Sequence, residues 1–161
     1  IDLKEIQNKV IKKENLYLFL MILIIFSIDR FSKNMILNNL TEQKYINDFI
    51  NFNLTWNTGI GFGLFSSNSN LTYLLVTLLI FSIILILIFL AINSDRYDKI
   101  VYSIITGGAI GNLFDRITYN AVPDYIDIHY NNFHWFTFNV ADIFITIGIL
   151  VFILSNWFIK N

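Results

Sequence analysis

A run of 22 residues without a charged side chain, residues 71–92, most restricts how this chain can fold. An α-helix of about 20 apolar residues is long enough to cross the hydrocarbon core of a bilayer, which is about 30 Å thick. Three further apolar runs cover residues 16–28, 100–114 and 140–159. The sequence therefore predicts a membrane protein built from α-helices.

Composition supports this fold class. Only 14% of the 161 residues are charged, whereas a soluble domain carries about 25%. The net charge is −1 and no basic block is present, so we expect no nucleic-acid partner. The sequence has no cysteine, which excludes disulfides, thiol catalysis and cysteine-based metal sites. No internal repeat or long linker divides the chain, so we expect one domain over residues 1–161.

The first apolar run follows several lysines, as the apolar region of a secretory signal peptide does. No small-residue cleavage site follows, and residues 35–37 continue the apolar character beyond the charged residues at 29–33. We therefore interpret this segment as a retained helix. The four expected spans are residues 16–37, 71–92, 100–115 and 140–159.

Positive side chains predict the orientation of these spans, because cytoplasmic loops carry the excess of Lys and Arg. They gather before the first span, between the second and third, and at the end of the chain: Lys4, Lys9, Lys12, Lys13, Arg96, Lys99 and Lys160. We therefore expect both termini in the cytoplasm. Residues 38–69 and 116–138 would then lie on the outer side.

Two strands are expected in these outer segments. Residues 51–57 alternate polar and apolar side chains, which is typical of a half-buried strand. Residues 121–130 form a second candidate, in which alternation places Asp124 on the face opposite to Asp127 and His129. We expect a small sheet on the outer membrane surface.

Asp142 stands at the start of the last apolar run. A carboxylate at the centre of a membrane helix costs about 2.5–3.5 kcal/mol, and such a cost marks a working group with a partner. The best partner is Asp124, which lies 18 residues upstream.

Two carboxyl groups that share one water do not both ionise easily. The ionised member can take a proton from the water, while the protonated member polarises a carbonyl and later protonates a leaving amine. The pair Asp124 and Asp142 therefore fits peptide hydrolysis without a covalent intermediate. The alternative is that each aspartate caps a helix or a turn separately.

The glycine-rich segment 107–116 is the next polar feature. Its glycines permit close contact between helices. Asn112 and Arg116 are four residues apart and share a helix face. They can face a substrate carbonyl, face a lipid ester, or serve the structure. Asp115 is interpreted as part of an ion pair at the end of the span.

Two further polar groups have both structural and functional interpretations. Asp29 and Lys33 are spaced as a helical ion pair, and alternatively they line a substrate groove. Asn57 can bond an extended peptide, and Gly59 permits close backbone approach; the alternative is an ordinary turn after a strand.

A metal site and a serine nucleophile are not expected. His129 lies opposite to Asp124 in the expected strand, and no HExxH-type spacing occurs. Ser32 beside Lys33 is the one serine that could act as the nucleophile of a Ser-Lys mechanism. No neighbouring motif in the sequence supports that role.

Two other functions remain open at this point. An ion- or proton-coupled transporter would use intramembrane charges as a relay: Asp29, Lys33, Asp115, Arg116 and Asp142. The centres of the second and fourth spans carry no charge, which counts against a path across the membrane. A small lipid-binding scaffold would tolerate replacement of the aspartates.

Five motifs in order identify a family. They are Asp-x-x-Ser-Lys at residues 29–33, Asn-x-Gly-x-Gly-Phe at 57–62, the glycine-rich Asn-x-x-Asp-Arg segment at 107–116, Val-x-Asp-aromatic at 122–125, and Phe-Asn-x-Ala-Asp at 138–142. With these motifs the chain resembles the lipoprotein signal peptidases, the type II signal peptidases of bacteria. Two positions depart from the family pattern, because Asn120 stands where glycine is usual and Phe136 where proline is usual.

The resemblance implies a membrane aspartic endopeptidase of the bacterial cytoplasmic (inner) membrane. Such an enzyme removes the signal peptide from diacylglyceryl-modified prolipoproteins and cuts before the lipidated cysteine of the lipobox. The implied fold is four transmembrane helices with a small extracytoplasmic β-cradle, and the active site lies at the outer face. The family needs no metal or cofactor and is the target of globomycin. We expect a monomer in contact with membrane lipid.

The resemblance also assigns roles to residues. Asp124 and Asp142 match the catalytic pair. The residues expected to bind or orient the substrate and the pair are Asn57, Gly59, Asn112, Arg116 and Asn139. Those expected to support the site are Asp29, Lys33 and Asp115.

Overall fold

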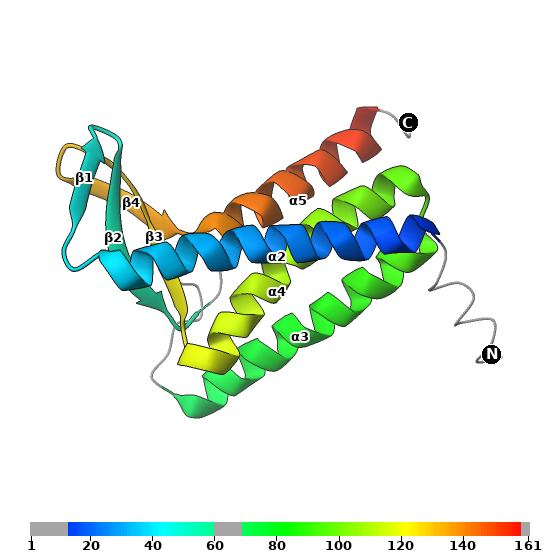
Figure 1. Cartoon of the computed structure of the whole chain (residues 1–161), viewed down its shortest axis with the longest axis horizontal. Helices are drawn as coiled ribbons and strands as arrows, with labels where there is room; N and C mark the ends of the chain where they lie inside the picture. Colours follow the sequence, from blue (N-terminus) through cyan, green and yellow to red (C-terminus); the bar gives the residue numbers. More distant parts are fainter. Residues whose placement is uncertain (1–12, 60–68, 159–161) are drawn as a thin grey trace.

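The computed structural model describes residues 13–59 and 69–158. In these residues four long helices and a four-stranded antiparallel sheet follow one another along the chain. The elements are α2 (Lys13–Asn39), β1 (Lys44–Asn47), β2 (Ile50–Asn57), α3 (Asn70–Asn93), α4 (Arg96–Tyr119), β3 (Val122–Tyr130), β4 (Phe133–Phe138) and α5 (Val140–Phe158). The sheet lies at one end of the helices, and α2 begins and α5 ends at the other end (Figure 1).

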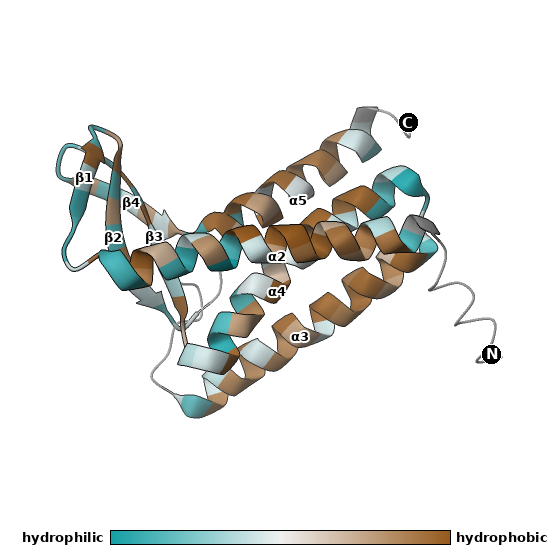
Figure 2. Cartoon of the chain, in the orientation of Figure 1, coloured by the Kyte–Doolittle hydropathy of each residue, from teal (hydrophilic) through white to brown (hydrophobic). Residues whose placement is uncertain are grey.

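Three of the four helices are long and apolar enough to cross a membrane: Asn15–Asn39, Asn70–Asn93 and Val140–Trp157. Along α3 nearly every residue is hydrophobic (Figure 2), and large side chains such as Leu75 and Phe89 are exposed on its surface. A soluble protein rarely leaves such a continuous apolar surface in water. The chain is therefore a multi-pass membrane protein.

The expected third span, residues 100–115, belongs to α4. This helix is not among those that are long and apolar enough to cross a membrane. Its ends carry charged side chains, and four of these are buried: Asp98, Lys99, Asp115 and Arg116. This polarity is tolerated because α4 packs against α2, α3 and α5 and is shielded by them. Three spans are thus clear from composition, and α4 is the helix around which they assemble.

Glycines in α4 permit this close packing, as the sequence predicted. A side chain at Gly107 would lie 2.8 Å from Ile25 of α2. A side chain at Gly108 would lie 2.6 Å from the carbonyl oxygen of Ala141 at the start of α5. Only glycine lets both neighbouring helices approach α4 this closely.

The sheet has the order β1-β2-β3-β4, with every neighbouring pair antiparallel. The two strands expected from the sequence are confirmed as β2 and β3, which pair directly, with Thr55 opposite Asp124. The outer strands β1 and β4 were not predicted. β3 lies between two partners, and its residues Val122 to Tyr125 are buried. The sheet therefore holds Asp124 in its protected interior.

The end of α4 depends on Asn120, which has φ of 58° and lies in the left-handed region. Its N–H donates a hydrogen bond to the carbonyl oxygen of Arg116 at 3.1 Å. Asparagine tolerates this conformation better than other residues with a Cβ. The turn can therefore form although glycine is absent.

We predict that Asn120→Ala lowers the free energy of unfolding by about 1 kcal/mol, because alanine is strained in the left-handed region. Asn120→Gly is the matched control and should be at least as stable as the native chain. Unfolding of the purified protein in detergent, followed by circular dichroism, measures both. Equal stability of the two variants would contradict this account of the turn.

Candidate active site

Asp124 in β3 and Asp142 in the first turn of α5 are held by three asparagines. Asn57 Nδ2 donates to Asp124 Oδ2 at 2.9 Å, and Asn139 Nδ2 donates to Asp124 Oδ1 at 2.6 Å. Asn112 Nδ2 donates to Asp142 Oδ1 at 2.8 Å, and the backbone N–H of Asn139 donates to Asp142 Oδ2 at 3.1 Å. Every carboxylate oxygen of the pair thus accepts one hydrogen bond, and Asn139 contacts both carboxyl groups.

The local sequence explains where Asp142 lies. Asn139 immediately precedes α5, and its side-chain oxygen accepts the N–H of Asp142 at 3.2 Å. In return, the carboxylate of Asp142 accepts the N–H of Asn139, so the two residues form a reciprocal capping box. Capping and participation in a carboxylate pair, which the sequence offered as alternatives for Asp142, therefore occur together.

Burial and charge act on Asp124, which is 3% exposed. Desolvation, and after it the negative charge of Asp142, raises the pKa of Asp124 to about 6. The hydrogen bonds from Asn57 and Asn139 act in the opposite direction, because they stabilise the ionised form. Near neutral pH the carboxyl of Asp124 therefore holds a proton more readily than an aspartate in water.

A buried ion cluster lies beside the pair, between α2 and α4. Lys33 Nζ bonds Asp29 Oδ2 at 2.9 Å and Asp115 Oδ2 at 2.6 Å. Arg30 bonds the same two carboxylates, at 3.0 Å to Asp29 and 2.6 Å to Asp115. Two positive and two negative charges thus balance one another where Lys33, Asp29 and Asp115 are fully buried.

This cluster confirms one expectation and extends another. The helical ion pair of Asp29 and Lys33 is present. Asp115 does form an ion pair at the end of its helix, but its partners lie on α2, far away in the sequence. The ion pairs of Arg30 were not predicted from the sequence. Residues adjacent in a helix do not normally face one another, so the neighbouring Asp29 did not indicate an ion pair.

The cluster also reaches the start of α5. Asp29 Oδ1 accepts the N–H of Ala141 at 3.0 Å, which is one of the free donors of the first turn. A side chain at Gly111 would lie 2.5 Å from Asp29 Oδ2, so glycine at this position makes room for the carboxylate. Asp29 therefore connects α2 to the helix that carries Asp142.

Arg116 holds the chain that follows β2. Its guanidinium donates to the carbonyl oxygens of Thr58, at 3.3 Å, and Gly59. The N–H of Gly59 donates to Asn57 Oδ1 at 2.8 Å, and Tyr73 of α3 donates to the carbonyl oxygen of Arg116 at 2.7 Å. Arg116 and Gly59 thus join the end of β2 to α3 and α4 beside the carboxylate pair.

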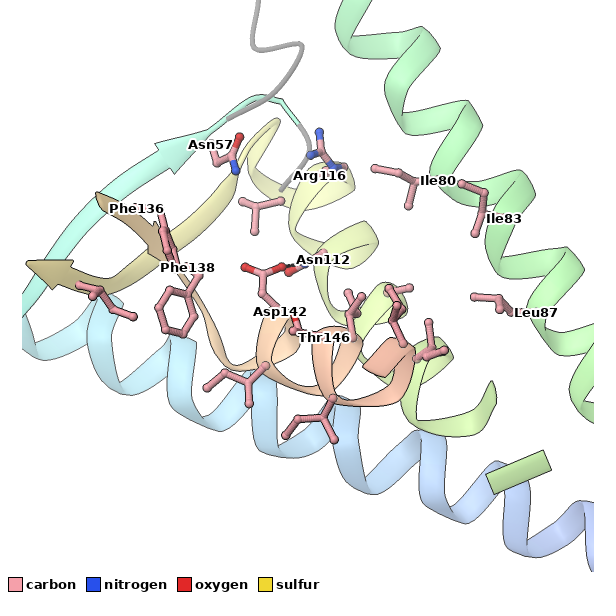
Figure 3. Close-up of a pocket in the computed structure, with 18 residues that line it drawn as sticks. Asn57, Ile80, Ile83, Leu87, Asn112, Arg116, Phe136, Phe138, Asp142 and Thr146 are labelled. Carbon is pink, nitrogen blue, oxygen red and sulfur yellow. Dashed lines mark hydrogen bonds between the residues drawn. The ribbon is translucent and has the colours of Figure 1, made fainter. Parts of the chain in front are cut away.

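A cavity of about 630 Å³ opens beside Asp142 (Figure 3). Its polar lining residues are Asn57, Asn112, Arg116, Asp142 and Thr146, and the rest of the lining is apolar. The apolar lining comes from α3, α4, α5 and the sheet: Ile80, Ile83, Leu87, Ile105, Ala109, Ile143, Ile145, Ile147, Ile149, Val122, Ile128, Phe136 and Phe138. A mainly apolar cavity with a few convergent polar groups is typical of a ligand site.

The remaining residues considered from the sequence are engaged elsewhere. Ser32 Oγ donates to the backbone oxygen of Asp29 at 2.8 Å. His134 Nδ1 lies 2.6 Å from Asp127 Oδ2, and its ring stacks on His129 with 5.4 Å between the centroids. Asp124, Asp127 and His129 all lie in β3 and are buried.

Comparison with known proteins identifies relatives over most of the chain. A family model described as signal peptidase (SPase) II matches residues 21–158. The lipoprotein signal peptidase of Pelagibacter ubique (strain HTCC1062) is 47% identical, with 94% of both chains covered. That of Wigglesworthia glossinidia brevipalpis is 42% identical over 85% of this chain and 92% of the relative. A solved bacterial membrane enzyme has the same fold, with a TM-score of 0.71, 23% identity, and coverage of 90% of this chain and 92% of the other.

We predict that one carboxyl of the protein titrates with a pKa of about 6, being protonated below and ionised above that pH. Infrared difference spectra of the protonated carboxyl band in detergent measure this titration. The band should disappear in Asp124→Asn. Asn57→Ala should move its midpoint to higher pH, because it removes a donor to the ionised form. A band unchanged in Asp124→Asn would contradict the assignment.

Proposed function

Because the chain belongs to the signal peptidase II family, whose members are membrane proteases that process prolipoproteins, we propose that it is an aspartic endopeptidase with Asp124 and Asp142 as its catalytic pair. One observation carries the proposal: Asn139 donates a hydrogen bond to each of the two carboxyl groups. This shared donor brings the two groups together, and Asp142 lines the mainly apolar cavity, as does Asn57, which bonds Asp124.

The chemistry proposed for the pair requires one proton between the two carboxyls. The ionised carboxyl takes a proton from a water that attacks the scissile carbonyl carbon, and the protonated carboxyl polarises the carbonyl oxygen. Collapse of the tetrahedral intermediate breaks the C–N bond, and a carboxyl protonates the leaving amine. The raised pKa of Asp124 supports this scheme, because its carboxyl then holds a proton more readily near neutral pH than an aspartate in water does.

The proposed substrate is a diacylglyceryl-modified prolipoprotein, cut before the lipidated cysteine of its lipobox. The apolar cavity supports this choice, since residues of α3, α4 and α5 line it together with Asp142, and its apolar lining suits a substrate that stays in the bilayer. Asn57, Gly59 and Arg116 would orient the peptide at the sheet end. Asn112 and Asn139 orient the carboxyls, while Asp29, Lys33 and Asp115 support them.

The proposed topology places both termini in the cytoplasm and the sheet with the carboxylate pair at the outer face. In this arrangement α4 is a fourth span, shielded from lipid by the other helices, and the whole chain is one domain that works as a monomer. The arrangement of the helices supports the proposal, since α2 begins and α5 ends at the end opposite the sheet (Figure 1). The lysines near the N-terminus, and Arg96 and Lys99 in the first turn of α4, agree with it.

A transporter has no specific support. Neither α3 nor the part of α5 beyond Asp142 carries a charged side chain. The charges of the ion cluster are paired with one another, which leaves no relay through the middle of these helices.

We predict that Asp124→Asn and Asp142→Asn each reduce cleavage of a diacylated prolipoprotein at least about 10²-fold, because each removes an acid or a base from the reaction. Mobility of the substrate on a gel measures cleavage by the purified protein, and globomycin should inhibit the native chain. Asp95→Asn is the matched control: Asp95 caps α4 at the other end, and asparagine keeps that cap. Native activity in either site variant would exclude the pair.

The absence of cysteine from the sequence allows a direct test of the topology. We predict that Asn132→Cys, between β3 and β4, reacts in spheroplasts with a thiol reagent that does not cross membranes. Arg96→Cys, at the start of α4, should react only after the membrane is opened. Both positions are exposed. The reverse pattern of labelling would overturn the proposed orientation.

A further inference from the structure

We propose that Lys33 is a positioning residue for the carboxylate pair and that it acts through Asn112. The inference rests on the proposed function. It assigns to Lys33 a role beyond general support of the fold, because the lysine determines which end of the Asn112 side chain faces Asp142.

The hydrogen bonds of Lys33 are the first observation. Its ammonium group has three donors, and each has an acceptor: Asp29 Oδ2 at 2.9 Å, Asp115 Oδ2 at 2.6 Å and Asn112 Oδ1 at 2.9 Å. The first two acceptors balance charge within the ion cluster. The third is a neutral amide oxygen, which connects the cluster to the carboxylate pair.

The amide of Asn112 transmits this contact. Its oxygen accepts from Lys33, and its nitrogen donates to Asp142 Oδ1 at 2.8 Å. If the amide turned over, its NH₂ group would face the ammonium of Lys33 and its oxygen would face the carboxylate of Asp142. Both contacts would then be repulsive, so the charge of Lys33 fixes the amide with its donor toward Asp142.

The consequence for Asp142 follows from its two donors. One, the N–H of Asn139, belongs to the start of its own helix. The other comes from Asn112 on α4, and it sets the direction of Oδ1 relative to the cavity that Asp142 lines. Reaction rates are sensitive to displacements of about 1 Å in such groups. Loss of the fixed donor should therefore affect the chemical step more than substrate binding.

Arg30 provides a matched control within the same cluster. It bonds the two carboxylates that Lys33 bonds, Asp29 and Asp115. Among the hydrogen bonds of residues 13–59 and 69–158, it makes none to Asn112. If the two cations serve only to hold α2 against α4, their loss should affect activity alike.

The test compares Lys33→Met with Arg30→Met in the purified full chain, with kcat and KM measured on a diacylated prolipoprotein and corrected for the folded fraction. Both variants should unfold at a lower temperature, because each removes an ion-pair partner. Only Lys33→Met should lower kcat, by about 10- to 100-fold with little change in KM. Equal kcat values for the two variants, or a change in KM alone, would overturn the proposal.

A double variant tests the route through Asn112. In an Asn112→Leu background, Lys33→Met should cause no further loss of kcat, because the connection is already broken. The same loss in both backgrounds would show that Lys33 acts in another way. Asp142→Asn serves as the reference: if it is active, the proposed function fails, whereas if it is inactive and the cycle is additive, only the role of Lys33 fails.

Asn112→Asp tests the same point with Lys33 retained, in case Lys33→Met does not fold. Lys33 keeps an acceptor, but Asp142 then faces a second carboxylate instead of a donor. Activity relative to the native chain should be lost at neutral pH and should recover partly at lower pH, where a protonated carboxyl can donate to Asp142. Native activity at neutral pH, or no recovery in acid, would contradict the inference.

Discussion

The structure depends on an ion cluster between α2 and α4, in which Asp29, Asp115 and Lys33 are fully buried and Arg30 is partly buried. An unpaired charge in this position would cost several kcal/mol, so each cation needs both carboxylates close at hand. Because Arg30 and Lys33 each bond Asp29 and Asp115, the two helices can meet in only one register. Asp29 extends the constraint to α5 through the N–H of Ala141. Asp29 thus connects the cluster to the first turn of α5.

The arrangement of the helices depends on which of them carry charged side chains that must be kept away from lipid. α4 contains buried charges at both ends and glycines between them, so it suits a position surrounded by other helices. α3 has no such groups, and its exposed surface is hydrophobic (Figure 2). In a membrane protein the polar helix is protected and the apolar helices face the lipid. The polar residues Asn112, Asp115 and Arg116 are therefore carried by the helix whose own composition is least typical of a span.

The candidate site depends both on contacts within a few consecutive residues and on contacts between residues far apart in the sequence. Asn139 and Asp142 position each other through a capping box that needs only four consecutive residues. Asp124 reaches them because β3 and β4 form a hairpin that returns the chain to the start of α5. Burial of Asp124, which lies in a strand with a partner on each side, raises the pKa of its carboxyl by desolvation. Peptide hydrolysis by this pair would thus depend on a short motif placed in an environment built by the whole fold.

The sequence by itself determined the membrane class, the strands at residues 51–57 and 121–130, and the helical spacing of Asp29 and Lys33, and it indicated Asp124 and Asp142 as the candidate pair. These features follow from local composition, alternation and motifs, which act over a few residues. Only the tertiary structure decided that Asp115 would pair with α2, that Arg30 would join it, and that β1 and β4 would complete the sheet. The bonds of Lys33 to Asn112 and Asp115 join residues 79 and 82 positions apart. No local pattern encodes such contacts, because they arise from the packing of one helix against another.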